Sequence, residues 1–409
     1  MASLSTITRV LAHRNTQIFY GGSFACWTGW WVQRIAVDWL AWQLTHSTAW
    51  VGIIAFCSLA PSVLISPFAG AIVDRVDRVH LTVLTQWITV AHALTLAALT
   101  YSGLIRIEVI AALEIVLGVS STFAQPARQS LVPGLVPRSE LPGAVALNSL
   151  TFNLSRSVGP GIGGIIVYNW GVVPAMLFNA ATYFFASQTM LRLKLAPEHR
   201  RGHAPTASVL AEAIEGVNYV VRHPGMGPLV LFAFLVGAFA RPVSETLAPY
   251  VDLLFHQGAG GLATLASVGG IAALAGGTLL AMRGGIRGMT RITLVAGFVI
   301  ILATILFIST GSFVVAIMCS AVWGVAGTIH GIAAQTLLQT TTSGQMLGRV
   351  LSLWGMIGRA APALGALAYG KFAEHFGLQP PVLVGCGLGL LGCLLVARRL
   401  KQIERSLER

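Results

Sequence analysis

Two pairs of opposite charges interrupt apolar stretches of the sequence. Arg34 and Asp38 lie in "QRIAVDWL", and Arg241 and Glu245 repeat the same Arg-x-x-x-acid spacing in "RPVSE". Residues four apart lie on one face of an α-helix, so each arginine can pair with the acid of its own segment. The repeat also allows crossed pairing, Arg34 with Glu245 and Arg241 with Asp38. Crossed pairs would open when protons neutralise the acids, whereas local pairs would only sustain folding.

Three further charged residues, Glu114, Arg156 and Arg359, fall within apolar segments. A buried, unpaired carboxyl group suits reversible protonation, and the alternative for Glu114 is a salt bridge to Arg156 or another buried arginine. Arg156 in "SLTFNLSR" and Arg359 in "SLWGMIGR" occupy equivalent positions of two similar segments. Two cations at mid-membrane depth would bind an anionic or hydroxylated ligand, or would neutralise Glu114 and fix the helix packing.

An aromatic group, Trp27, Trp30 and Trp31, precedes the first charged pair on the same segment. Indole rings stack on flat substrates, and they also pack at helix interfaces and against lipid. Both uses are compatible with the sequence. Together with Arg156 and Arg359, these tryptophans form the predicted lining of a substrate cavity.

The elements that must position these residues are membrane-spanning helices. Only 10% of the residues are charged and 55% are hydrophobic, with a mean hydropathy of +0.76, whereas soluble globular chains carry about 25% charged residues. The five cysteines show neither metal spacing nor a disulfide framework, and no Gly-x-x-x-x-Gly-Lys phosphate loop occurs. No nucleophile–base–acid set is present either. We therefore expect an integral membrane protein that has no cofactor and is not an enzyme.

Twelve apolar segments are long enough to span a membrane, which takes about 20 residues. They lie near residues 17–44, 49–72, 80–101, 107–126, 143–168, 171–191, 227–250, 262–282, 289–309, 312–335, 350–370 and 380–397. Lysine and arginine concentrate in one set of connecting loops, and the opposite loops carry only Arg106 and Lys371. The positive-inside rule therefore places both termini in the cytoplasm. The formal charge of +12 then requires no nucleic-acid partner, and anionic membrane lipid is the expected partner.

An internal repeat divides the chain into halves. The Arg-x-x-x-acid pairs and the two Ser-Leu…Arg segments recur about half the chain length apart, which indicates two parallel repeats with a site between them. We expect an all-α polytopic membrane protein with twelve transmembrane helices in two pseudo-symmetric six-helix bundles, residues 1–192 and 226–409. The central loop, 193–225, contains apolar residues at helical spacing and is predicted to form an amphipathic helix on the inner surface.

Two sequence blocks resemble the major facilitator superfamily. "GAIVDRVDR" at 70–78 resembles the loop between its second and third helices. The block from "PARQSLVPG" to "GPGIGG" at 126–164 resembles the transmembrane secretion effectors, the subfamily of the enterobactin exporter and macrolide-efflux proteins. The resemblance implies a monomeric transporter of the bacterial inner membrane that works by alternating access, with export driven by proton antiport. The sequence departs from the family at Asp77, where glycine is usual, and at Glu114, which replaces an arginine ahead of Gly118.

The resemblance also implies two structural devices. One is a cytoplasmic latch, in which an acid of the 70–78 loop binds the start of the eleventh helix; the alternative is a loop that only sets topology. The latch residues are Gly70, Asp74, Arg75, Arg78 and Arg349. The other is a motif that bends the fifth helix and lets a neighbouring helix approach closely. The motif residues are Gly159, Pro160, Gly163 and Gly164.

These features together predict a proton-coupled exporter of amphipathic small molecules, siderophore-like or drug-like. Asp38, Glu114 and Glu245 are the predicted proton carriers. One alternative is an energy-independent flippase for lysolipids on the same fold, which would run without a pH gradient. Another is a membrane receptor or assembly subunit, which would show no flux at all.

Overall fold

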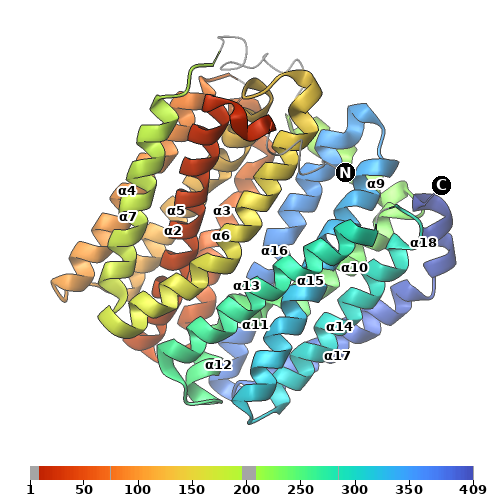
Figure 1. The fold of residues 1–409 in the computed structure, drawn as a ribbon. Helices are drawn as coiled ribbons and strands as arrows, with labels where there is room; N and C mark the ends of the chain where they lie inside the picture. The colour runs from red at the N-terminus through yellow and green to blue at the C-terminus, as the bar shows by residue number, and fades with distance from the viewer. Residues whose placement is uncertain (1–8, 74, 196–208, 284, 409) are drawn as a thin grey trace.

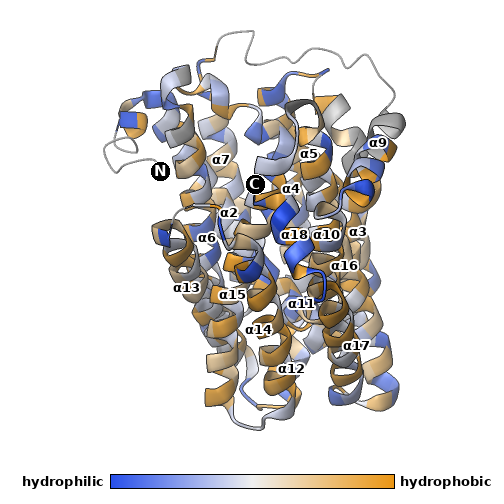
Figure 2. Cartoon of the chain, turned by 90° about the vertical axis from the view of Figure 1, so that its right-hand side faces the viewer, coloured by the Kyte–Doolittle hydropathy of each residue, from blue (hydrophilic) through white to orange (hydrophobic). Residues whose placement is uncertain are grey.

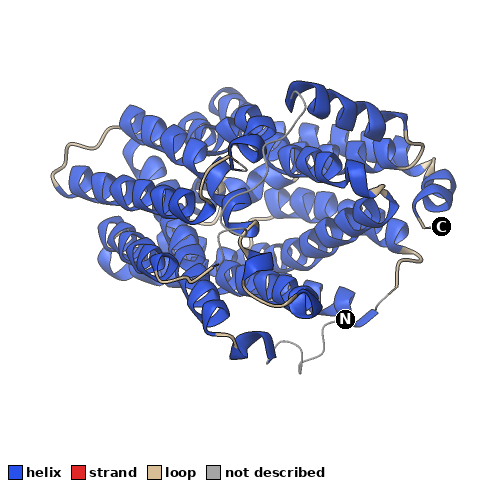
Figure 3. Cartoon of the chain, turned by 90° about the horizontal axis from the view of Figure 1, so that it is seen from above, coloured by secondary structure: helices blue, strands red, loops and turns tan. Residues whose placement is uncertain are grey.

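The chain folds into a long bundle of helices in the computed structural model, which describes residues 9–73, 75–195, 209–283 and 285–408. No strand occurs within those ranges. Seen from above, the bundle is elongated rather than round (Figure 3). Both ends of the described chain lie toward its upper end in Figure 1, together with α9 and α18.

The long helices run back and forth between the two ends of the bundle (Figure 1). Those of the first half are α2 (Arg14–Thr45), α3 (Thr48–Val73), α4 (Arg78–Tyr101), α5 (Ile107–Gln129), α6 (Leu141–Trp170) and α7 (Val172–Leu191). The second half contains long and short helices, namely α9 (Val209–Arg222), α10 (Met226–Phe239), α11 (Arg241–Glu245), α12 (Leu247–Leu253), α13 (Gly258–Arg283), α14 (Met289–Ser309), α15 (Phe313–Thr341), α16 (Gly344–Phe376), α17 (Gln379–Ala397) and α18 (Leu400–Leu407).

Eight helices of the described chain are long and apolar enough to cross a membrane, or nine if the bent pair α9–α10 counts as one. The sequence predicts twelve spans. The helix α2 is not among the eight: it has the length of a span but carries Arg34 and Asp38, which lower its hydropathy. On the side seen in Figure 2, hydrophobic residues predominate along α14 and α17, whereas α18 is hydrophilic. Large exposed apolar side chains such as Leu64 and Met282 suit contact with lipid.

The predicted continuous span at 227–250 is instead broken into α10, α11 and α12. Proline explains both breaks. Pro242 has no N–H to donate to the carbonyl four residues earlier, and Pro249 has the same effect on the carbonyl of Glu245. Thr246, between the two short helices, leaves the helical region with φ −134° and ψ 54°. The break isolates Arg241 and Glu245 on a single helical turn.

The two halves meet along two helix pairs, α3 with α16 and α6 with α13. Glycines let these helices touch. A Cβ atom added at Gly164 of α6 would lie 1.7 Å from the Cβ of Ala263 in α13. One added at Gly370 of α16 would lie 2.5 Å from the carbonyl oxygen of Thr48 in α3. Close backbone approach of this kind is how membrane helices gain packing energy without a hydrophobic driving force.

Candidate functional site

A cavity of about 1550 Å³ lies between the halves, lined by helices of both. Its lining reaches Gln129, Asn148, Gln339 and Gly348, which stand close to the helix ends on the side of the chain termini. Toward the other end of the bundle, α2 contributes no lining residue beyond Asp38 among those described. The cavity is therefore deepest near the charged pairs and extends toward the end where the termini lie.

The predicted charged pairs meet across the two halves, but only in part as the crossed arrangement expects. Arg34 of α2 forms an ion pair with Glu245 of α11, so this crossed contact is present. Arg241 pairs with the same carboxylate, through its other oxygen, at 3.3 Å and within its own helical turn. No contact between Arg241 and Asp38 occurs among the described residues. Instead, the Oδ2 of Asp38 accepts a hydrogen bond from the backbone N–H of Ala248 at 3.3 Å.

Three more contacts close the end of the bundle beyond these pairs. Trp42 Nε1 donates to Asp252 Oδ2 at 2.8 Å, joining α2 to α12. Thr48 Oγ1 donates to the carbonyl oxygen of Gly370 at 2.9 Å, and Ser47 Oγ donates to the Glu374 carboxylate. Each contact joins the first half to the second. The cavity is thus sealed at the end of the bundle opposite the termini.

Glu114 is buried, with 6% of its surface exposed, and the polar side chain nearest to it is a histidine rather than an arginine. Its Oε1 lies 3.5 Å from Nε2 of His92 on α4, which is long for a hydrogen bond. His92 Nδ1 accepts from Gln33 Nε2 at 3.0 Å, and Gln33 Oε1 accepts from Asn179 Nδ2 at 2.5 Å. This orientation of the Gln33 amide leaves the imidazole proton on Nε2, facing the carboxyl group.

The alternative of a salt bridge from Glu114 to Arg156 is not observed. Sequence reasoning missed His92, although a histidine within an apolar segment signals a polar contact. It also missed Arg128, which is buried in the last turn of α5. Arg128 stacks over the Trp27 ring at 4.1 Å and donates to Cys26 Sγ at 2.8 Å.

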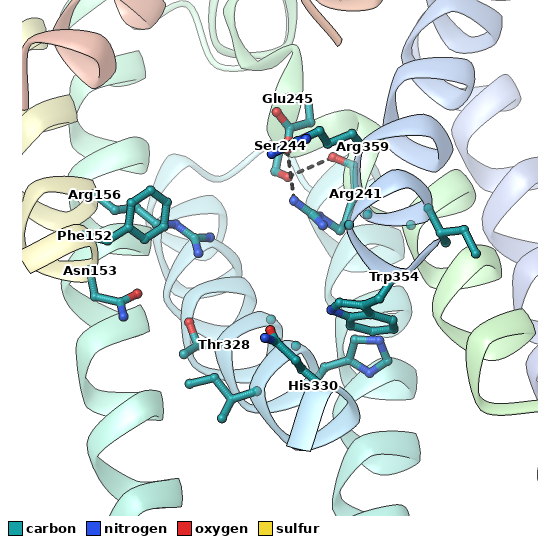
Figure 4. Close-up of a pocket in the computed structure, with 18 of the residues that line it drawn as sticks. Phe152, Asn153, Arg156, Arg241, Ser244, Glu245, Thr328, His330, Trp354 and Arg359 are labelled. Carbon is teal, nitrogen blue, oxygen red and sulfur yellow. Dashed lines mark hydrogen bonds and ion pairs between the residues drawn. The ribbon is translucent and has the colours of Figure 1, made fainter. Parts of the chain in front are cut away.

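Most of the residues predicted to line the substrate cavity do line it. Trp27, Trp31, Arg156 and Arg359 all line the cavity. Figure 4 shows Arg156 on one wall, with Arg241, Glu245 and Arg359 gathered across from it. Trp30 is not among the described lining residues.

Two of the lining arginines also lie near indole rings. The Arg156 guanidinium lies 5.9 Å from the centre of the Trp31 ring, and that of Arg34 lies 5.6 Å from the Trp30 ring. A cation over an indole face is attracted to it electrostatically. Trp30 therefore lies against Arg34 of the first charged pair, whereas Trp31 lines the cavity beside Arg156.

The latch residues that the structure describes lie at the end of the bundle that carries the termini. Arg349, near the start of α16, forms an ion pair with Glu215 of α9 at 2.5 Å. Gly70 belongs to α3, Arg75 is exposed after it, and Arg78 begins α4. Asp74, the acid of the proposed latch, lies outside the described residues, so its pairing stays a prediction.

The departure of the 70–78 loop from the family pattern has a structural explanation. Asp77 is the N-cap of α4, and its side chain accepts from the backbone N–H groups of Val79 and His80 at 2.9 and 3.0 Å. A carboxylate at this position satisfies two N–H groups that have no partner within the helix. Asp77 therefore starts α4, and this role accounts for a residue other than glycine.

The glycine motif of α6 provides the close approach that its sequence predicts. A Cβ at Gly159 would lie 2.5 Å from the Cβ of Trp31, and one at Gly163 would lie 2.9 Å from the Cα of Val32. Pro160 lies within the helix and is buried. These glycines seat α6 against α2, and Gly164 faces α13.

Gly163→Ala should lower the free energy of unfolding by about 1–3 kcal/mol, because the added methyl group meets backbone that cannot rotate away. Thermal unfolding of the purified protein measures this. The matched control is Gly21→Ala, at an exposed position of α2 where a Cβ meets nothing within 4 Å. Equal melting temperatures for the two variants would contradict the close packing.

Known proteins with similar sequences are transporters. Residues 9–408 match the family described as transmembrane secretion effector. The chain is 27% identical over 371 residues to the staphyloferrin A transporter of Staphylococcus aureus, covering 89% of this chain and 90% of the relative. It is 26% identical over 384 residues to the multidrug efflux pump Tap of Mycolicibacterium fortuitum, covering 90% and 92%. The enterobactin exporter EntS of Salmonella typhi is 26% identical over 369 residues, covering 87% and 84%.

Solved structures support the fold. A POT family transporter superposes with a TM-score of 0.81 at 11% identity, covering 96% of this chain and 97% of the other. A D-xylose–proton symporter superposes with a TM-score of 0.70 at 13% identity, covering 93% and 97%. Members of this superfamily are not enzymes. The chain belongs to the transmembrane secretion effector family of the major facilitator superfamily of membrane transporters.

Proposed function

We propose that this transporter is a proton-coupled antiporter that exports amphipathic small molecules by alternating access. The observation that carries the proposal is the cavity between the halves, sealed at one end by Arg34 and Glu245 and extending toward the other. An alternating-access transporter in a state that is closed at one end and open at the other has this geometry. Acids within the closing contacts give protons a means of opening it. The efflux pump and the exporter among the relatives support the outward direction.

The same proposal assigns the membrane arrangement. Twelve spans result if α10, α11 and α12 together form the seventh span and if α2, α6 and α7 each cross in addition to the eight helices already counted. Residues 1–192 and 226–409 then form the two bundles, and 193–225 connects them through α9, which packs against α3 and α16. The positive-inside rule places the termini in the bacterial cytoplasm, and the cavity then faces inward. We expect a monomer surrounded by lipid.

Flux into proteoliposomes with an imposed pH gradient tests this function. Staphyloferrin A and a macrolide antibiotic are suitable probes, because relatives are named for both classes. Proteoliposomes with an acidic lumen should accumulate at least one probe through the transporter molecules whose cytoplasmic face points outward. A protonophore should abolish this accumulation. Flux that is unchanged without the gradient would favour the lysolipid flippase. Lack of flux for the probes and for lysolipid would favour a receptor or assembly subunit.

Asp74→Asn should weaken closure of the inner face, because a charge-assisted contact to the start of α16 is lost. The measurement is labelling of a cysteine at Ser149, an exposed cavity position, by an impermeant maleimide in a protein freed of its native cysteines. Labelling should rise severalfold. Asp77→Asn is the matched control, since asparagine caps a helix as well as aspartate does. Unchanged labelling and transport in Asp74→Asn would exclude the latch.

A further inference from the structure

We infer that the substrate of this cavity is an anion, held by Arg156, Arg241 and Arg359. The inference rests on the proposed transport function and names the substrate class that the function leaves open. It excludes lipophilic cations as substrates.

The net charge of the cavity is the first observation that supports an anionic substrate. Its described lining contains two carboxylates, Asp38 and Glu245. It contains five arginines, namely Arg34, Arg156, Arg241, Arg349 and Arg359. One of the five, Arg349, is matched by Glu215 of α9, which lies outside this lining. The remaining four arginines outnumber the two carboxylates, so the cavity is positive and repels cationic ligands.

The second observation is that the arginines near the middle of the cavity have N–H groups available for a ligand. Within the described chain, the guanidinium groups of Arg156 and Arg359 form no ion pair and donate no hydrogen bond. Each is half-buried and lines the cavity. Arg241 makes one contact of 3.3 Å with Glu245, and its side chain is 44% exposed. Cations inside a membrane protein are costly unless an opposite charge or water compensates them. A planar guanidinium offers carboxylate and phosphate groups paired, parallel hydrogen bonds.

The third observation is the shape of the site. Figure 4 shows these arginines around one open volume, with Arg156 opposite Arg241 and Arg359 rather than beside them. A ligand that meets all three must carry several negative groups or one group that moves between them. The walls beside the arginines are aromatic, with Trp31, Trp323 and Trp354 among the lining residues. An anion with a flat or apolar body therefore fits better than a small inorganic ion.

The shared carboxylate gives such an anion a second effect. Glu245 divides its two oxygens between Arg34 and Arg241, and the contact to Arg241 is the longer and more exposed of the two. A substrate carboxylate entering the cavity competes with Glu245 for Arg241. Substrate binding would thereby loosen one of the two contacts that hold Glu245 at the sealed end, which couples loading to opening.

Isothermal titration calorimetry on the purified full chain tests the inference without a pH gradient. The probes are benzene-1,3,5-tricarboxylate and its neutral analogue, benzene-1,3,5-tricarboxamide, which share a ring and differ in charge. The tricarboxylate should bind, and the amide should bind at least tenfold more weakly. Arg156→Gln and Arg359→Gln should each weaken tricarboxylate binding about ten- to a hundredfold, the worth of a charge-assisted hydrogen bond. Arg156→Lys should weaken tricarboxylate binding less than Arg156→Gln does, because it retains the charge but loses the planar pair of donors.

Arg106→Gln, which removes an exposed arginine far from the cavity lining, is the matched control and should change nothing. Equal affinity for the two probes, or tricarboxylate binding that survives both Arg→Gln changes, would overturn the inference. So would lack of tricarboxylate binding up to its solubility limit. None of these results bears on proton coupling, which the gradient-driven flux tests separately, so the two failures are distinguishable.

Discussion

Replacing Arg34 with glutamate is expected to abolish gradient-driven transport, and adding Glu245→Arg should restore it. The single change puts a second carboxylate beside that of Glu245, so like charges meet where the closed end needs an ion pair. Breaking a partly buried pair costs a few kcal/mol, and each 1.4 kcal/mol is a tenfold change in a two-state population. We expect flux to fall ten- to a hundredfold in either single variant and to recover most of that loss in the double variant.

The control for this exchange is a swap within α2, Arg34→Asp together with Asp38→Arg. That swap preserves the charges of the helix but moves the arginine one turn away from Glu245. If the ion pair across the halves closes the cavity, the swap within α2 should remain inactive. Recovery in that variant, with no recovery in the Arg34→Glu and Glu245→Arg double variant, would show that the charges act locally.

Glu114→Gln is expected to abolish the dependence of transport on the pH gradient while substrate still binds. The carboxyl group is buried beside His92 and outside the described cavity lining, so its loss removes a proton site without touching substrate. Accumulation against a gradient should fall to the level of passive exchange. Flux into proteoliposomes measures the coupling, and calorimetric titration measures the binding.

Glu108→Gln is the matched control for this change, because Glu108 lies on the same helix but is exposed at its first turn. It should leave coupling intact. Normal coupling in Glu114→Gln would make the carboxyl group structural. In that case the Gln33–His92–Asn179 cluster would serve to hold α2, α4 and α7 together.

The sequence repeat allowed either crossed or local pairing of the charged residues, and the contact between Arg34 and Glu245 is of the crossed kind. Equivalent positions of two parallel repeats face each other across a pseudo-twofold axis, so an arginine of one half finds the acid of the other. The same symmetry predicted a second bridge, from Arg241 to Asp38, that is not observed. The halves differ there because Pro242 and Pro249 break the second copy into short helices, whereas α2 is continuous. Arg241 therefore binds the acid on its own turn.

Partners drawn from different helices were harder to predict. Glu114 looked isolated because its neighbours in sequence are apolar, and its partner His92 comes from the adjacent helix α4. Which residues of two packed helices face each other depends on their rotation and depth, and neither is encoded in the spacing along one segment.

The distance across the sealed end tests the central claim most directly, namely that the Glu245 ion pair keeps this end of the cavity closed. Spin labels at Gln43 of α2 and Leu253 of α12 flank the contact between Trp42 and Asp252, and both positions are exposed. Double electron–electron resonance should give a short distance in the parent protein. Glu245→Gln should add a longer distance there and shorten the distance between labels at Ser149 and Gln339 near the other end. Unchanged distances at both ends in Glu245→Gln would contradict the account.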